Sequence, residues 1–177
     1  NNRYVEARTL TGTIVNTSRA IARFSMTKLK PVCPERCYKM ITLVRAFAIA
    51  LPFHVTHDGD LIDMQSEYNR LTPEYIRNSF ETRLQEELGK PIAEDVLRAK
   101  NRPLRILQMM SLHAAKTDLD PLFLNRLDGE IRALEIALGG CERILRTPIP
   151  SSYTRHTSRF LTIWTWCLPF VLWPYCG

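Results

Sequence analysis

The 17 residues from Phe160 to Cys176 contain no charged side chain and hold all three tryptophans of the chain. A helix of this length covers about 25 Å, slightly less than the roughly 30 Å of hydrocarbon in a bilayer. Tryptophan is enriched where a membrane helix meets the lipid headgroups. The segment is therefore predicted to begin a transmembrane helix. Composition leaves one alternative open, a buried carboxy-terminal helix of a water-soluble protein.

The stretch before this apolar segment is basic, with four arginines against one acid, Glu142. Pro148-Ile149-Pro150 forms a stiff corner within it, because proline cannot continue a helix. Basic residues beside a membrane helix favour the cytoplasmic side. We therefore predict a cytosolic region over residues 1–159, or its topological equivalent, and the start of a transmembrane helix over 160–177. The four arginines are Arg143, Arg146, Arg155 and Arg159.

The remainder of the chain has the composition of a protein in water. The 177 residues have a mean hydropathy of −0.16, which excludes a bundle of spanning helices. The net charge of +6 indicates an acidic partner, an anionic membrane surface or a small anion. The first residues lack the apolar core of a signal peptide and the chain stops within a hydrophobic run, so we expect an internal fragment of a longer protein.

Helical periodicity dominates the rest of the sequence, and no alternating stretch is long enough for a strand. The predicted fold class is therefore all-α. Pro31 and Pro34 are expected to break the chain between Lys28 and Pro34, and Pro52 is expected to end the second helix. The predicted helices cover 3–24, 35–53, 72–88, 91–100, 101–116 and 120–146, with a polar loop at 56–71.

Two of these helices are predicted to bury an apolar face, and one of the two also contains glycines. Three glycines lie inside the helix over 120–146, and each costs roughly 1 kcal/mol relative to alanine, which suggests close backbone contact or a local break. They are Gly129, Gly139 and Gly140. The predicted core residues are Met40, Val44, Phe47, Ala48 and Leu51 in the helix over 35–53, and Leu127, Ile131, Leu134 and Leu138 in the helix over 120–146.

Motifs for catalysis or metal binding are weak in this sequence. Cys33 and Cys37 form a pair that His54 or His57 could complete as a metal site, but no second pair exists and the nearby prolines explain the segment as a linker. Both histidines are expected at the surface. The chain contains no Gly-rich phosphate loop, no His-Glu-x-x-His and no Gly-x-Ser-x-Gly. We predict no enzyme, no cofactor and no metal site.

Several segments together resemble the bestrophin family of anion channels, and in particular its bacterial, fungal and plant or algal branch. The resemblance covers nearly the whole chain, with residues 54–100 the weakest part. Its specific block is the Thr-Pro-Ile-Pro corner. The matching segments are Gly139-Gly140-Cys141-Glu142-Arg143-Ile144, Thr147-Pro148-Ile149-Pro150, Ser152-Tyr153, Arg159-Phe160, Leu168-Pro169-Phe170, Arg3-Tyr4 with Glu6-Ala7-Arg8, and Leu119-Asp120-Pro121-Leu122.

The resemblance implies a subunit of a homopentamer with one central pore and a large cytosolic vestibule. It implies that Leu122 forms the cytosolic aperture, that residues 1–24 include the end of a membrane helix, and that the neck and the calcium-clasp acids lie outside this chain. The predicted function is passive transport of chloride, with bicarbonate as a further anion. The expected location is the plasma membrane or the thylakoid membrane. The family motif residues are Glu142, Arg143, Pro148, Ile149, Pro150 and Tyr153.

Two other functions remain as alternatives. The first is a membrane-tethered helical scaffold that transports nothing. The second is a basic helical domain that binds nucleic acid, whose basic residues should gather on one face together with aromatic side chains. In this chain the basic residues are spread along the sequence and alternate with acids, so the expected partners are small anions, lipids and further copies of the chain.

Overall fold

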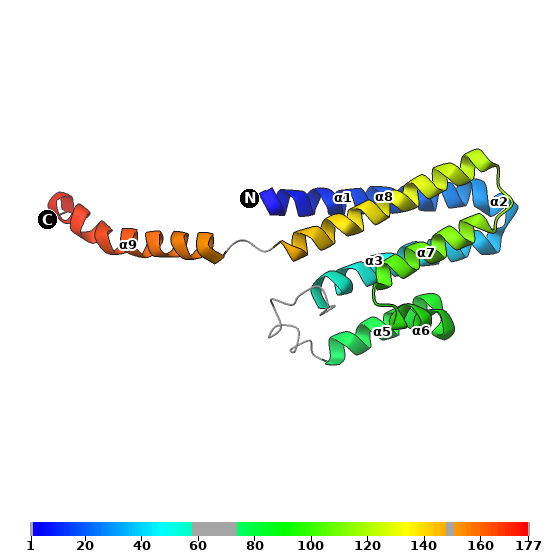
Figure 1. Cartoon of the computed structure of the whole chain (residues 1–177), viewed down its shortest axis with the longest axis horizontal. Helices are drawn as coiled ribbons and strands as arrows, with labels where there is room; N and C mark the ends of the chain where they lie inside the picture. Colours follow the sequence, from blue (N-terminus) through cyan, green and yellow to red (C-terminus); the bar gives the residue numbers. More distant parts are fainter. Residues whose placement is uncertain (1, 58–73, 148–150, 177) are drawn as a thin grey trace. The chain divides into compact units, whose positions relative to one another are not determined.

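The computed structural model of the protein describes residues 2–57, 74–147 and 151–176, and every element within these ranges is helical. The all-α prediction is therefore confirmed. The chain divides into two compact units, residues 1–146 and 147–177. The first unit contains α1 (Asn2–Phe24), η1 (Ser25–Leu29), α2 (Lys30–Val32), α3 (Pro34–His57), α5 (Glu74–Leu88), α6 (Lys90–Arg98), α7 (Arg102–Ala115) and α8 (Pro121–Arg146), and the second contains α9 (Ser151–Cys176) (Figure 1).

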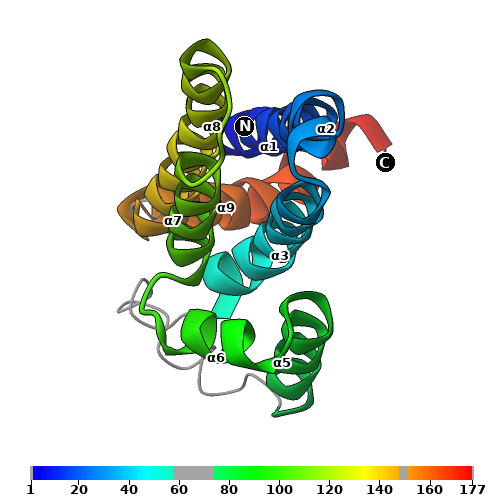
Figure 2. The same cartoon turned by 90° about the vertical axis from the view of Figure 1, so that its right-hand side faces the viewer.

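The helices of the first unit pack in an order different from their order in the sequence. The first long helix, α1, lies along the last one, α8, and α8 also contacts α7. In turn, α7 contacts α3, α3 contacts α5, and α5 contacts α6. In Figures 1 and 2, α5 and α6 accordingly lie on the opposite side of α3 from α1. The α1–α8 pair thus brings together the first and the last helix of the unit, which are farthest apart in the sequence.

The predicted buried face of α8 is confirmed, because Leu127, Ile131, Leu134 and Leu138 are at most 4% exposed. On α3, four of the five predicted core residues are buried, namely Met40, Val44, Phe47 and Leu51. The prediction was wrong for Ala48, which is exposed and lines a groove between α3 and α5. The five predicted residues cover a wide arc of the α3 surface. Ala48 lies at the edge of this arc, beside the open groove.

The predicted break at Lys30-Pro31 was wrong. The backbone of α1 continues into the π-helix η1, in which the amide of Lys30 donates to the carbonyl of Ser25, and then into the short helix α2. Pro31 lies in the first turn of α2, where its missing N–H is tolerated. The predicted break at Cys33-Pro34 is confirmed, because Cys33 has the extended backbone (φ −148°, ψ 93°) that is expected before a proline.

The prediction that Pro52 ends the second helix was also wrong, because α3 continues through this proline to His57. Contacts beyond Pro52 explain the continuation. The ring of Phe53 stacks on Phe80 of α5 with 4.1 Å between centroids, and His54 is buried at 3% exposed. Pro52 itself is exposed, and the hydroxyl of Thr56 donates to its carbonyl at 2.7 Å. Tertiary packing therefore outweighs the missing amide of one proline.

The glycines within α8 cause no break, because the helix is continuous from Pro121 to Arg146. A Cβ atom built on Gly140 would lie 2.7 Å from Cδ2 of Leu10 on α1, which is closer than real carbon atoms approach. Gly140 thus permits the close approach of α1 and α8. Gly129 and Gly139 differ, because a Cβ on either would meet no atom within 4 Å.

The apolar terminal segment forms the second half of α9, which begins at Ser151. Among the described residues, the helix that is long and apolar enough to cross a membrane is a different one, Pro34–Thr56 of α3, with a mean hydropathy of 1.3. Within the chain 44% of that apolar window is buried, and core helices of water-soluble proteins have the same length and composition. The membrane assignment of 160–177 therefore stays a prediction.

Candidate functional site

Leu122, the predicted aperture residue, is the second residue of α8. Its amide donates to the Asp120 carboxylate at 2.8 Å, and Pro121 occupies the first helical position, so this helix start is well defined. The side chain of Leu122 is 73% exposed. A leucine this exposed contributes little to the hydrophobic core of the chain.

Glu142 connects three helices near the other end of α8. Its Oε1 accepts a hydrogen bond from Nδ2 of Asn101 at 2.9 Å and lies 3.0 Å from Nε2 of His54. The Asn101 side chain also caps α7 by accepting from the amide of Leu104 at 3.1 Å. One largely buried carboxylate thus fixes the end of α3, the start of α7 and the last turns of α8 relative to one another.

The expectation that His54 lies at the surface was wrong. Its position extends the apolar stripe of α3, since it follows Phe47 by seven residues and Leu51 by three. This spacing could have identified His54 as buried, but the assumed helix end at Pro52 concealed it. Beside Glu142, burial raises the pKa of the Cys141 thiol, and the adjacent carboxylate raises it further. Cys141 is therefore kept protonated and weakly reactive.

Arg143 forms an ion pair with Glu6 on α1. Arg3 of α1 also donates to the backbone carbonyl of Ile144. These contacts join the first turns of α1 to the last turns of α8. The other motif residues cannot be placed in the same way, because Pro148, Ile149 and Pro150 lie outside the described residues, and Tyr153 lies in the first turn of α9 with its side chain outside the described part.

Positive charge is concentrated at the start of the chain. Residues 1–34 hold six of the 24 lysines and arginines but one of the 18 acidic residues. From Ala7 to Pro34 there is no acid at all. This segment forms α1, η1 and α2, so one edge of the first unit carries most of the net charge of +6. The expectation that basic residues alternate with acids along the sequence was therefore wrong for residues 7–34, where a count along the chain finds no acid.

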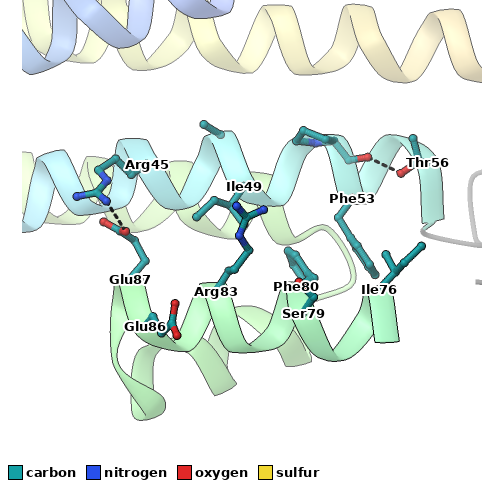
Figure 3. A pocket seen from close by; sticks show the side chains of 12 residues that line it. Arg45, Ile49, Phe53, Thr56, Ile76, Ser79, Phe80, Arg83, Glu86 and Glu87 are labelled. Carbon is teal, nitrogen blue, oxygen red and sulfur yellow. Dashed lines mark hydrogen bonds and ion pairs between the residues drawn. The ribbon is translucent and has the colours of Figure 1, made fainter. Parts of the chain in front are cut away.

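A groove of about 760 Å³ separates α3 from α5. Figure 3 shows Phe53 and Phe80 facing each other at one end and Arg45 meeting Glu87 at the other, at 3.1 Å. Arg83 and Glu86 add one further charge of each sign. The opposite charges balance, so the groove does not favour an anion.

Metal ligands do not gather in the described part of the chain, where no three His, Cys, Asp or Glu side chains are close enough to hold one ion. Cys33 and Cys37 are free thiols. Cys37 is buried, and its sulfur lies 3.8 Å from the sulfur of Met26. Burial raises the pKa of the Cys37 thiol. The pair therefore serves packing at the turn between α2 and α3.

Comparison with known proteins places this architecture in a family. The family described as Bacterial/Fungal Bestrophin protein matches residues 1–177. The chain is 29% identical over 177 residues to the chloroplastic voltage-dependent chloride channel 1 of Arabidopsis thaliana, covering 99% of this chain and 38% of that protein. It is 28% identical over 175 residues to a voltage-dependent anion channel-forming protein of Synechocystis, covering 95% of this chain and 50% of that protein.

The fold also matches a crystal structure of a mutated bacterial bestrophin homologue from Klebsiella pneumoniae. The TM-score is 0.73 at 23% identity, covering 97% of this chain and 58% of the other. The chain therefore spans 38% to 58% of the length of these three relatives. Because the family match extends over all 177 residues, the chain belongs to the bacterial and fungal bestrophin family.

Proposed function

We propose that this chain is part of one subunit of a pentameric anion channel, which passes chloride and bicarbonate down their gradients through a central pore. The observation that carries the proposal is the family match along all 177 residues, together with relatives named as chloride and anion channels. Those names describe channels rather than enzymes. Transport of this kind requires no cofactor and no chemical step, so the physical task is to attract, admit and release an anion.

The charge distribution supports anion attraction. The acid-free segment from Ala7 to Pro34 carries five cationic side chains. Around a fivefold axis each charge is repeated five times, and a concave wall of low dielectric focuses the resulting potential. A vestibule built in this way raises the local concentration of chloride. The five side chains are Arg8, Arg19, Arg23, Lys28 and Lys30.

Leu122 is proposed as the narrow aperture of this pathway. Five exposed leucines, one from each subunit, would form an uncharged ring at the start of α8. A ring of apolar side chains hinders hydrated ions by partial dewetting, and it does so without binding them. The capped helix start at Asp120 and Pro121 gives each leucine a fixed position, as a constriction requires.

The proposed location is a membrane, with residues 160–177 as the start of a spanning helix and lipids as its surroundings. The relatives include chloroplastic channels and anion channel-forming proteins of bacteria, so the thylakoid membrane and the plasma membrane are the two candidate sites. The uncharged run from Phe160 to Cys176 supports this placement.

Planar bilayers containing the purified full-length protein test the function directly. With a tenfold gradient of potassium chloride, the current should reverse near the chloride equilibrium potential, about 59 mV from zero. Replacement of chloride by a large organic anion on one side should shift the reversal accordingly. A reversal that follows potassium would contradict the proposal, and a silent bilayer from an intact oligomer would favour the scaffold alternative.

Replacement of Leu122 tests the aperture. In Leu122→Ala the ring loses three carbon atoms from each subunit, so the passage is wider and easier to wet. We expect a larger unitary conductance and a permeability ratio between thiocyanate and chloride that differs from that of the parent. Leu112→Ala on α7 is the matched control, because Leu112 is also an exposed leucine (49%) in a helix. Equal conductance and selectivity in the parent and both variants would contradict the aperture assignment.

A further inference from the structure

The helix α8 has two opposite faces with different surroundings. One face is buried against α1 and α7 and supplies Leu127, Ile131 and Leu134 to the core. The opposite face is exposed along most of the helix. Residues seven apart lie almost above one another on a helix, so this face consists of two adjacent rows. The rows are Leu122, Gly129 and Ile136, and Asn125, Arg132 and Gly139, and we call the six residues the outer face of α8.

The outer face of α8 is not composed like an ordinary solvated surface. Leu122 and Ile136 are 73% and 66% exposed. Gly129 and Gly139 have no packing reason within the subunit, since a Cβ on either would meet open space, yet each costs roughly 1 kcal/mol relative to alanine. If these two apolar residues and two glycines faced only water, polar residues with a high helix propensity would be expected in their place.

The charge of the outer face has one sign. None of its six residues is acidic, and Arg132 lies near its centre. The nearest acids along the helix are Asp128, four residues before Arg132, and Glu135, three residues after it, so they occupy neighbouring positions on the helix surface. No ion pair joins either of them to Arg132. Among the residues that the structure describes, Arg132 has no ion-pair partner, in contrast to Arg143, which pairs with Glu6. The guanidinium is therefore available to an anion.

We propose that the outer face of α8 lines the anion pathway beyond Leu122, and that Arg132 is a conductance-determining residue for a hydrated monovalent anion such as chloride. This inference rests on the proposed function and assigns a second position to the same pathway. Ten residues separate Arg132 from Leu122, which corresponds to about 15 Å along the helix. An anion that has passed the uncharged aperture would next meet a ring of guanidinium groups.

The exposure of Arg132 favours the passage of an anion over its tight binding. A guanidinium is more weakly hydrated than an ammonium, so it exchanges its water for an anion easily. Because Arg132 is exposed, its attraction for an anion is attenuated by water, and conduction requires sites weak enough to release the ion. The two glycines keep the helix surface free of further side chains around it. Together they form a wide, weakly attractive section of the pathway.

Charge reversal at Arg132 is the first test, made in the full-length protein in bilayers. We expect Arg132→Glu to lower the unitary chloride conductance in 0.1 M potassium chloride by about two- to fivefold, because the local anion concentration falls. The deficit should shrink in 1 M salt, where the Debye length is about 3 Å instead of about 10 Å. The matched control is Arg98→Glu on α6, an exposed arginine that loses the same charge away from α8. Equal conductance in the two variants at both salt concentrations would overturn the inference.

Cysteine accessibility is the second test, and it does not depend on the folding of a charge-reversal variant. In Ile136→Cys, a negatively charged methanethiosulfonate reagent should react within the open channel and lower the current, because a fixed negative charge repels anions. The parent protein controls for its own cysteines, of which Cys37 is buried and Cys141 is half-buried, both with a thiol pKa raised by burial. A thiol at 136 that stays unmodified, or that forms disulfides between subunits, would instead place the outer face of α8 in a subunit contact and overturn the inference.

The two proposals fail in different ways. A parent protein without anion-selective current refutes the proposed function. A parent that conducts chloride, combined with an Arg132→Glu variant equal to Arg98→Glu and an unreactive Ile136→Cys, leaves the function intact and refutes the assignment of the outer face of α8.

Discussion

Leu127→Ala is expected to cost the folded protein about 2–5 kcal/mol, whereas Leu122→Ala, five residues earlier on the same helix, is expected to change the free energy of unfolding by no more than about 0.5 kcal/mol. Leu127 is fully buried and Leu122 is 73% exposed. The first substitution leaves a cavity between α8 and its neighbours, and the second removes atoms that contact mainly solvent in the subunit.

The two variants form a matched pair, since the residue type, the substitution and the helix are the same. Unfolding of the purified protein by urea, followed by circular dichroism, measures the difference in midpoint. Equal losses in the two variants would show that Leu122 is packed in the native protein, which would contradict its placement at an open aperture. A stable Leu122→Ala protein with altered anion selectivity would show that this leucine serves the pathway instead of the core.

The boundaries of α8 and its buried face were predictable from sequence because three independent signals agree. Asp120 and Pro121 begin the helix, the apolar residues recur at helical spacing, and the sequence Pro-Ile-Pro, which cannot continue a helix, follows its end. Helical periodicity of this strength outweighs even the cost of internal glycines.

The end of α3 was not predictable from local rules. Proline normally ends a helix, but α3 continues through Pro52 because Phe53 and His54 are held by α5 and α8. Those contacts join residues far apart in the sequence, since His54 and Glu142 are separated by 88 positions. A prediction from one sequence uses local preferences, and it cannot include a contact with a helix whose position is unknown.

The candidate site, like the helices, was predictable from the sequence only in part. Leu122 came from the resemblance to bestrophins, because nothing in its chemistry distinguishes an aperture leucine from any other apolar residue. Its exposure gives a physical reason to regard it as functional. Glu142 was recognised as a motif residue, but its role in connecting α3, α7 and α8 required the positions of His54 and Asn101. The outer face of α8 became visible once burial had identified the opposite face.

The contact between Gly140 and Leu10 predicts a second large effect on stability. A leucine at either Gly139 or Gly140 gains a similar helix propensity, about 0.8 kcal/mol over glycine. At Gly140 the new Cβ alone would lie 2.7 Å from Leu10, while at Gly139 it would meet no atom within 4 Å. We therefore expect Gly139→Leu to be neutral or slightly stabilising, and Gly140→Leu to be less stable than Gly139→Leu by about 1–3 kcal/mol.

Urea unfolding of the two variants measures this difference, and a third protein identifies its cause. The added side chain must displace Leu10 or push α1 away from α8, so removal of the Leu10 side chain should relieve the overpacking. Leu10→Ala combined with Gly140→Leu should recover part of the stability lost by Gly140→Leu, although Leu10→Ala alone removes packing from the same interface. Additive losses in the double variant would mean that Leu10 and Gly140 do not meet, and the close approach of α1 to α8 that aligns Glu6 with Arg143 would then need another cause.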